Sequence, residues 1–206
     1  MNAVDLSALL GGRFPRVTPR ASGDFPAYNV PADGLLDLMR VLRDEAGFDL
    51  LTDVSGVDWG MDAEPRFGVF YHLRSLASNE YLRVATLCSV GEPPRVPSVV
   101  SLWPSADWHE RETYDFFGIQ FEGHPDLRRI LMWDGYLHFP LRKDFPLAGV
   151  ETVLPDDEVA AETGAKVQAA PMMGGPFVAP QQDTVVKREP RARDESWNEK
   201  KPKPLA

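Results

Sequence analysis

The sequence predicts an α+β domain with a mainly antiparallel sheet of about four strands, packed with two or three helices and followed by a loop-rich segment and an extended C-terminal arm. Three observations lead to this class. Residues 33–46 carry apolar residues at the helical period. Residues 66–76 and 81–90 alternate at the strand period around a short link. Beyond residue 150 the apolar residues lose any period.

The N-terminal part of the chain contains four expected elements. Asp5–Leu10 fits a short helix that ends at Gly11–Gly12, and residues 25–30 fit a strand. Residues 33–46 form the clearest helix, because their leucines and methionine recur on one side with charges opposite. Residues 48–58 are apolar and rich in β-formers, which indicates a strand and its exit.

A hairpin and a second long helix are expected in the middle of the chain. The short link Ala77–Glu80 joins the two alternating segments and predicts a hairpin. Val99–Leu102 begins either a final strand or a helix. Residues 105–118 read as a helix, with Ser105 as a candidate N-cap and Gly118 as the stop.

Composition divides the chain into two parts. We expect residues 1–150 to fold as one domain that includes loops over 119–150. The remaining 151–206 contain seven of the 19 prolines and short apolar clusters without a period. This composition predicts an extended arm whose order depends on a partner.

Overall charge and cysteine content exclude several classes of function. The net charge is 22 − 31 = −9, which argues against a nucleic-acid-binding protein. No run of 18 apolar residues is present, so we expect no direct membrane span, and the N-terminus lacks the pattern of a secretory signal. The single cysteine cannot build a cysteine-ligated cluster within the chain.

Standard catalytic and cofactor motifs are missing from the sequence. It contains no glycine-rich phosphate cradle and no G-x-S-x-G nucleophile motif. His109 and Glu112 are three apart on one predicted helix, a spacing that can bind metal, but no second helical pair supports a site. Cys88 lies within an alternating strand, which favours a buried structural thiol over a nucleophile. We therefore predict no catalytic, cofactor-binding or metal-binding residues in this chain.

The densest polar segment is WHERETYDFFG at 108–118. Arg111 and Asp115 are four apart and can pair on a helix surface, which is the ordinary reading of such a face. Paired carboxylates at Glu110, Glu112 and Asp115 could alternatively do acid–base work. Aromatic residues crowd the same helix, and this mixture of charge and aromatic rings is typical of an interface.

Two short basic pairs follow in proline-anchored, loop-like sequence. Arg128 and Arg129 lie in HPDLRRIL (124–131), and Arg142 and Lys143 lie in FPLRKDFPL (139–147). Their forked or extended cations could dock onto acidic groups of a partner. They could equally be surface charges that keep a loop soluble.

The string ERETYDFFGIQFEGHPDLRRILM, followed by PLRKDFPL, resembles the C subunit family of proton-pumping NADH:quinone oxidoreductase, respiratory complex I. A looser resemblance extends back to about residue 30. The family's charged helix, its G-H-P-D-L-R-R-I-L loop and its P-L-R-K-D segment all match. The residues that carry the resemblance are Glu110, Arg111, Glu112, Tyr114, Asp115, Gly118, His124, Pro125, Asp126, Arg128, Arg129, Pro140, Leu141, Arg142, Lys143 and Asp144.

The resemblance implies a non-catalytic hydrophilic scaffold of the peripheral arm, on the cytoplasmic side of a bacterial membrane. FMN and iron–sulfur clusters would belong to other subunits, and the partners would be chiefly the D subunit, with B and I. It implies buried ion pairs for the four charged residues between Glu110 and Asp115. Arg128, Arg129, Arg142 and Lys143 would contact the domain or the D subunit.

Three positions depart from the family pattern and two alternatives stay open. His138 replaces a common glycine, Trp133 a proline and Phe145 a tyrosine. The nearer alternative is the equivalent subunit of a membrane-bound hydrogenase or ferredoxin-dependent relative. The farther alternative is a stand-alone hydrolase that uses the helix carboxylates.

Overall fold

The computed structural model describes residues 9–146, 149–150, 152–153, 156–164 and 166–167. The chain separates into two compact units, 1–145 and 146–206. The predicted boundary at residue 150 and the partner-dependent arm remain predictions, since most of 151–206 lies outside the described residues.

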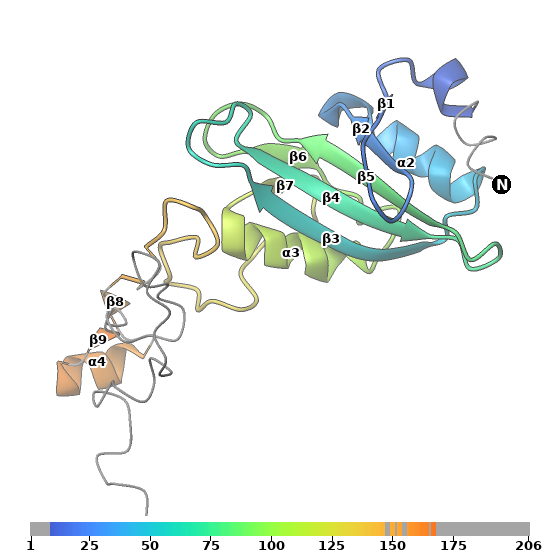
Figure 1. The fold of residues 1–206 in the computed structure, drawn as a ribbon. Coiled ribbons are helices and arrows are strands. Elements are labelled where there is room, and N and C mark those ends of the chain that lie inside the picture. The colour runs from blue at the N-terminus through green and yellow to red at the C-terminus, as the bar shows by residue number, and fades with distance from the viewer. Residues whose placement is uncertain (1–8, 147–148, 151, 154–155, 165, 168–206) are drawn as a thin grey trace, which may run out of the picture. The chain divides into compact units, whose positions relative to one another are not determined.

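A five-stranded mixed sheet forms the centre of the first unit (Figure 1). Its order is β1-β2-β5-β4-β3, in which β2 is parallel to β5 and every other neighbouring pair is antiparallel. The strands are β1 (Thr18–Pro19), β2 (Ala27–Val30), β3 (Leu50–Asp58), β4 (Phe67–Arg74) and β5 (Tyr81–Leu87). The predicted β4–β5 hairpin is confirmed, and the sheet has one more strand and one more parallel pairing than expected.

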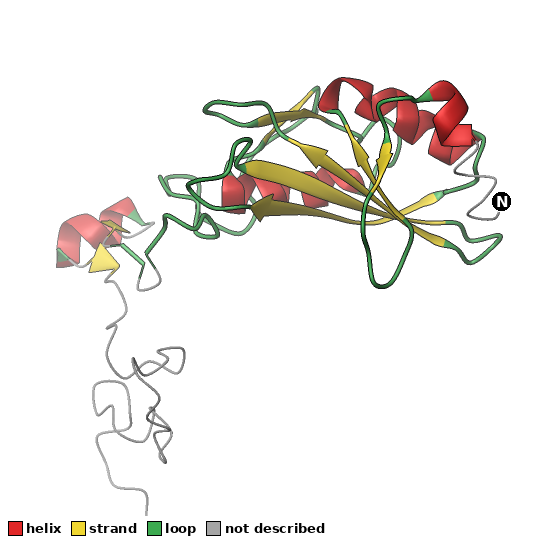
Figure 2. Cartoon of the chain, turned by 45° about the horizontal axis from the view of Figure 1, so that its top comes forward, coloured by secondary structure: helices red, strands yellow, loops and turns green. Residues whose placement is uncertain are grey.

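The long helices α2 (Leu35–Asp44) and α3 (Ala106–Phe117) lie on the same face of this sheet (Figure 2). A short 3₁₀ turn, η1 (Ala32–Gly34), leads into α2. The apolar stripe predicted for 33–46 is buried completely at Leu35, Leu38 and Leu42. Alternation along β4 and β5 sends every second side chain into the same core, and the fully buried members of those strands include Tyr71, Leu73 and Val84.

Helix α3 sits close against β3 because Gly56 has no side chain. A Cβ on Gly56 would lie 2.7 Å from the Phe117 ring and 2.9 Å from the Thr113 methyl group. Thr113 also donates a hydrogen bond to the Val54 carbonyl at 3.3 Å. This close approach fixes the height of α3 above the sheet, and therefore the position of its charged residues.

A second small sheet was not expected. β6 (Arg95–Pro97) and β7 (Gln120–Glu122) pair in parallel, and their central Val96 and Phe121 join the main core. The proline-rich connector and the segment after Gly118, expected to be loops, therefore each supply a three-residue strand. Val99–Leu102 forms neither a strand nor a helix but a turn, with Leu102 N–H bonded to the Val99 carbonyl.

Helix boundaries differ from the expectation at two points and agree with it at a third. The N-terminal helical residues are 9–13, so the helix passes through Gly11–Gly12, while residues 5–8 lie outside the described part. Ser105 precedes α3 without capping it, because its hydroxyl donates to the Leu51 carbonyl instead. Gly118 does end α3, in the left-handed conformation with φ +73°.

The second unit contains short elements within its described residues. β8 (Thr152–Val153) and β9 (Lys166–Val167) pair antiparallel on either side of α4 (Asp157–Thr163) in the sequence. The Asp156 carboxylate caps α4 by accepting the Glu158 and Val159 amides, both at 3.0 Å. No helix in the described part of the chain is long and apolar enough to cross a membrane.

Candidate functional site

Helix α3 turns most of its charged residues inward. Glu110 and Asp115 are completely buried, Arg111 is 5% exposed, and Glu112 alone of the four faces solvent. The predicted Arg111–Asp115 surface pair is therefore wrong. Charged groups this deeply buried must find partners, and most of those partners lie in the segment 123–145. We call that segment the pinned loop.

The first anchor of the pinned loop is the Asp115 carboxylate. Its Oδ1 accepts a hydrogen bond from the Arg129 guanidinium at 2.6 Å. Its Oδ2 accepts from the backbone amides of Ile130, Leu131 and Met132, at 3.0, 2.7 and 2.9 Å. One side chain of α3 thus gathers three successive backbone amides and a guanidinium from a segment without regular structure.

These donors decide the charge of Asp115. Burial alone would raise its pKa, but the three amides and Arg129 outweigh burial and hold the pKa below its ordinary value. Arg129 is itself held from several sides: it donates to the Asp115 and His138 carbonyls at 2.9 and 3.0 Å and lies over the ring of Phe139. The pair is therefore ionised and rigid.

The second anchor ties the end of the pinned loop to the sheet. Asp58, at the end of β3, accepts two hydrogen bonds from Arg66 and one from the Lys143 amide at 2.8 Å. Arg66 also reaches Asp144 at 2.8 Å. Burial opposes the ionised form of Asp58, yet these donors, with the Gly60 amide, lower its pKa to about 2.

The third anchor is Arg142, which crosses the C-terminal end of α3. Its Nε donates to the Phe117 carbonyl at 2.7 Å, and its two terminal nitrogens bind Glu92 at 3.0 and 3.2 Å. Gly118 makes this crossing possible, since a Cβ there would lie 2.7 Å from both Arg142 and the Phe139 ring. The helix stop and the loop anchor thus depend on one glycine.

Arg111 and His124 secure the start of the pinned loop. Arg111 donates to the carbonyls of Arg128 and Arg129 at 3.2 and 3.3 Å, and its guanidinium lies over the Trp108 ring. His124 accepts the Asp126 amide on Nδ1 at 3.0 Å, so its Nε2 carries the proton and faces Asp107 Oδ1 at 3.0 Å. Both residues organise the backbone of this chain.

Glu110 differs from the other acids of α3. One oxygen accepts the Val99 amide at 2.7 Å, and the other has no hydrogen-bond partner among the described residues. Burial, only partly offset by hydrogen bonds from the Ser98 side chain and the Val99 amide, raises the pKa of Glu110 to about 7. Among the described residues, the expected buried ion pairs are confirmed at Asp115 alone; Glu110, Arg111 and Glu112 form none.

Three leucines of the pinned loop are exposed, among charged residues such as Asp126, Arg128 and Lys143 that also face solvent. Leu131, Leu137 and Leu141 are 54%, 85% and 52% exposed. In the same segment, the ring centroids of Trp133 and Tyr136 lie 4.6 Å apart. Leucines this exposed on a rigid support are typical of a surface that binds another protein.

Three observations describe the metal-binding, thiol and acidic groups of the chain. Within the described residues, no group of three or more His, Cys, Asp or Glu side chains could hold a metal ion. The Cys88 thiol is buried, and burial raises its pKa to about 12, which confirms the structural reading. Asp58 and Asp115 are held ionised by fixed donors, so neither can serve as a proton donor near neutral pH.

The structure separates the two basic pairs that the sequence presents as equivalent. Arg129 and Arg142 have side chains only 9% and 14% exposed and point inward, whereas Arg128 and Lys143 face solvent. Arg128 pairs at the surface with Asp126. Pro125 and Leu141 are also exposed, while Tyr114 and Pro140 are partly buried.

Sequence reasoning missed three members of the anchors: Asp58, Arg66 and Glu92. For Asp58 and Arg66, strand alternation and pairing offered a signal that could have identified them. Alternation along β3 places Asp58 on the helix-facing side with Val54 and Gly56, and Asp58 is the register partner of Phe67, next to Arg66. A carboxylate at an inward position of a strand needs a cation nearby. Nothing local marks Glu92.

Comparisons with known proteins agree on one family. The family described as "Respiratory-chain NADH dehydrogenase, 30 Kd subunit" matches residues 28–151. The chain is 48% identical over 130 residues to a C subunit, designated C 2, of the NADH-quinone oxidoreductase of Rhizobium meliloti (strain 1021), covering 62% of this chain and 70% of the relative. It is 42% identical over 167 residues to the C subunit of the NADH-quinone oxidoreductase of Phenylobacterium zucineum (strain HLK1), covering 77% and 78%.

A solved structure shares the fold. One chain of the membrane-bound sulfane sulfur reductase, an archaeal respiratory membrane complex, superposes with a TM-score of 0.61. The match covers 79% of this chain and 91% of that one, at 23% sequence identity. At this identity the likeness concerns the fold alone.

Proposed function

Because the chain belongs to the 30 kDa subunit family of respiratory-chain NADH dehydrogenase, we propose that it is a non-catalytic scaffold subunit in the peripheral arm of an NADH:quinone oxidoreductase. The observation that carries this proposal is the pinned loop. Three charged anchors hold an irregular segment rigid, and the segment presents exposed leucines in place of reactive groups.

Rigidity matters because docking a flexible segment costs conformational entropy. The anchors fix the backbone of the pinned loop before any partner arrives, so less entropy is lost on assembly. Interface surfaces of this kind combine an apolar centre with aromatic support. The pinned loop contains both kinds of residue: three exposed leucines and the contacting rings of Trp133 and Tyr136.

Electron transfer would then occur in the partner subunits. In this proposal FMN and the iron–sulfur clusters belong to other chains, and the D subunit is the main partner, with B and I as neighbours. The complex would lie on the cytoplasmic side of a bacterial membrane, with this chain attached through the complex. The absence of a metal-binding group among the described residues is compatible with this division of labour.

A substitution at Leu137 tests the scaffold role. Leu137 is 85% exposed and belongs to none of the three anchors. Leu137→Asp therefore removes exposed apolar surface, and the isolated chain should still fold normally. We expect a several-fold loss of assembled complex, measured by native electrophoresis of gently solubilised membranes with an NADH:quinone activity stain. The matched control is Leu76→Asp, at a 59%-exposed leucine after β4, which should leave assembly unchanged.

Normal assembly of Leu137→Asp with lost turnover would contradict the scaffold role and favour a direct part in catalysis. Charge reversal at Arg142 is a useful second variant. It should also lower assembly, but through detachment of the loop from the Phe117 carbonyl, and therefore with increased protease cleavage of the isolated chain.

The geometry gives no support to a stand-alone hydrolase. Glu110 faces the core, Asp115 faces the pinned loop and Glu112 faces solvent, so the three carboxylates share no site. Purified chain should therefore show no hydrolytic activity. The relatives named above, at 42% and 48% identity, favour NADH:quinone oxidoreductase over the hydrogenase-type alternative.

A further inference from the structure

The sheet has a second exposed surface, remote in sequence from the pinned loop. Both long helices cover one face, and within the described part of the chain the connection between β1 and β2 crosses the opposite face (Figure 1). A groove of about 530 Å³ lies there. We call it the open-face groove; its apolar floor comprises Val57, Trp59, Phe70, Ala85 and Leu87.

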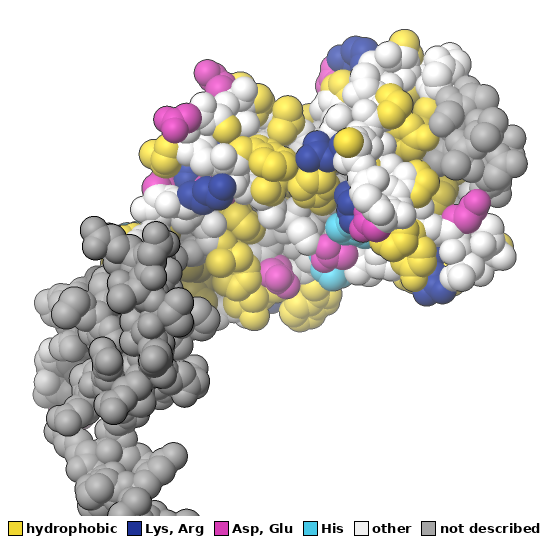
Figure 3. Space-filling view, viewed as in Figure 1, with side chains coloured by type: hydrophobic (Ala, Val, Ile, Leu, Met, Phe, Trp, Pro, Cys, Tyr) yellow, Lys and Arg dark blue, Asp and Glu magenta, His cyan; other side chains and the backbone are white. Residues whose placement is uncertain are grey.

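Strand alternation and one glycine create this floor. Phe70 on β4 and Leu87 on β5 occupy positions that point away from the core. Gly68 lies between them, and a Cβ there would be 3.3 Å from the Trp59 indole nitrogen. The absent side chain leaves room for the indole over the sheet. Trp59 and Leu87 nevertheless stay 42% and 49% exposed, and Figure 3 shows apolar side chains on this face.

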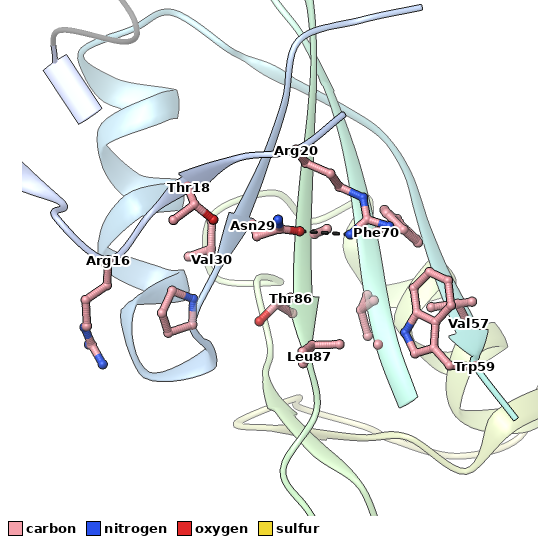
Figure 4. Close-up of a pocket in the computed structure, with 14 residues that line it drawn as sticks. Arg16, Thr18, Arg20, Asn29, Val30, Val57, Trp59, Phe70, Thr86 and Leu87 are labelled. Carbon is pink, nitrogen blue, oxygen red and sulfur yellow. Dashed lines mark hydrogen bonds between the residues drawn. The ribbon is translucent and has the colours of Figure 1, made fainter. Parts of the chain in front are cut away.

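The rim of the groove is cationic. Arg20 stretches over the floor, with its guanidinium 5.0 Å from the Phe70 ring centre and 5.7 Å from that of Trp59 (Figure 4). Its hydrogen-bond partner is the neutral Asn29 amide at 2.9 Å. Arg16 is the second cation of the rim. Among the residues that the structure describes, no Asp or Glu lines the groove, although the whole chain carries a net charge of −9.

Arg20 contrasts with most arginines of the described part of the chain, which pair with carboxylates. Arg16 itself binds Asp33, and Arg83 on the same face binds Asp24. Arg20 pairs with no carboxylate among the described residues. A cation held over two aromatic rings without an anionic partner is a ready binding site for a carboxylate.

Thr86 lines the groove where β2 ends, with its side chain on the core side of β5. β2 ends at Val30, the register partner of Thr86, while β5 continues to Leu87. At this step the Thr86 hydroxyl is buried and has no hydrogen-bond partner among the described residues.

From these features we infer that the open-face groove docks a polypeptide segment of a partner subunit that presents a carboxylate beside a bulky apolar side chain. The apolar side chain packs on Trp59, Phe70 and Leu87. The carboxylate binds the Arg20 guanidinium at the rim. The inference rests on the proposed function, since it assigns a second contact surface to the same scaffold.

Site-specific photo-cross-linking in intact cells tests this docking. A benzophenone amino acid at position 87 should form an adduct with another subunit of the complex. Mass spectrometry of that adduct should place a carboxylate within two residues of an aromatic or large aliphatic side chain. The same probe at position 76, an exposed leucine after β4 that does not line the groove, is the control and should give no such adduct.

Variants of Arg20 test the charge. Arg20→Gln keeps a donor for Asn29 but removes the cation, and should lower adduct yield about five-fold. Arg20→Lys keeps the cation and should retain at least half of the yield. Arg95→Gln removes an exposed cation of the second sheet and should change nothing. Thermal unfolding of each isolated variant separates loss of docking from loss of fold.

The outcomes distinguish the two proposals. Co-purification with other members of the NADH:quinone oxidoreductase but no adduct at position 87 would overturn the docking inference and leave the scaffold role intact. An adduct with a second copy of the chain, or with a segment lacking a carboxylate, would overturn it as well. Failure to co-purify with the complex would refute the scaffold role, while the adduct formed in cells would still decide the docking inference.

Discussion

Two carboxylates five positions apart on α3 have opposite electrostatic environments. Asp115 and Glu110 are both completely buried. Asp115 accepts three backbone amides and a guanidinium, and its pKa falls. Glu110 accepts one backbone amide, has one oxygen without a hydrogen-bond partner in the described part of the chain, and has a pKa raised to about 7.

Burial alone therefore does not decide whether an acid is charged; the number and kind of its donors decide it. Asp115 lies where a separate segment of the chain can close over it, and that segment supplies the donors. Glu110 lies one and a half turns earlier and faces the apolar core. One helix thus holds a permanent anion that organises a loop and an acid that loses its proton near neutral pH.

Removal of the Asp115 carboxylate should have the largest effect. Asp115→Ala leaves Arg129 without its anion and three amides without an acceptor, so we expect a loss of about 4 kcal/mol in the free energy of unfolding. Urea unfolding of the purified chain measures it. Glu112→Ala, on the exposed side of the same helix, should cost below about 0.5 kcal/mol. A similar cost for both variants would show that the anchor does not stabilise the fold.

Glu110→Gln should remove a pH-dependent penalty. Glutamine keeps an oxygen for the Val99 amide, so the variant isolates the charge. The pKa of Glu110 rises from 4.5 to about 7 on folding. Below pH 4.5 both states are protonated and no penalty exists; it grows between pH 4.5 and 7, where only the unfolded chain ionises, and then levels off.

The difference between wild-type and Glu110→Gln stability should therefore shift by roughly 3 kcal/mol between pH 4 and pH 8, in favour of the variant at pH 8. Urea unfolding of both proteins across this range measures the shift, and contributions from Asp58 and Asp115 cancel in the comparison. A flat difference would mean that Glu110 titrates normally in the folded protein.

Gly118→Ala should have an intermediate effect. A Cβ at φ +73° is strained, and here it also meets Arg142 and Phe139. We expect a loss of about 2 kcal/mol. Hydrogen exchange should be faster at the Leu131 and Lys143 amides, which depend on the position of the pinned loop. Unchanged exchange at both amides would show that the loop tolerates displacement at this crossing.

The smallest effect should come from Arg128→Ala. Arg128 neighbours Arg129 in the sequence but pairs with Asp126 in solvent, with both side chains more than half exposed. We expect no resolvable change in the urea midpoint, because exposed ion pairs stabilise proteins little. A loss of stability as large as that of Asp115→Ala would mean that the exposed Arg128–Asp126 pair stabilises the fold as much as the buried Arg129–Asp115 pair.

The periodic elements could be predicted from sequence because their signal is local. The apolar stripe of α2 and the alternation of β4 and β5 each lie within one short segment. The parallel pairing of β2 with β5 could not be predicted, because no local pattern names a distant partner. The strands β6 and β7 were missed because three residues carry too little periodicity.

The candidate site shows the same limit. Its charged residues could be identified from the sequence. Whether each side chain points inward or toward solvent could not. Arg128 and Arg129 are chemically identical neighbours, and only the closure of the loop over Asp115 makes one buried and the other exposed. Asp58 pairs across a strand register with Arg66 and reaches an amide 85 residues away, which local sequence does not encode.

That 85-residue separation has a consequence for biosynthesis. The sheet can close once β5 has left the ribosome, but the Asp58 and Arg66 anchors need the backbone near Lys143 and Asp144. Such distant contacts form late, because long chain segments must first be brought together. The leucine-bearing surface is therefore completed last, and nascent or truncated chains that end before Lys143 cannot present it. Partner subunits that recognise this surface would then select only chains synthesised past the final anchor.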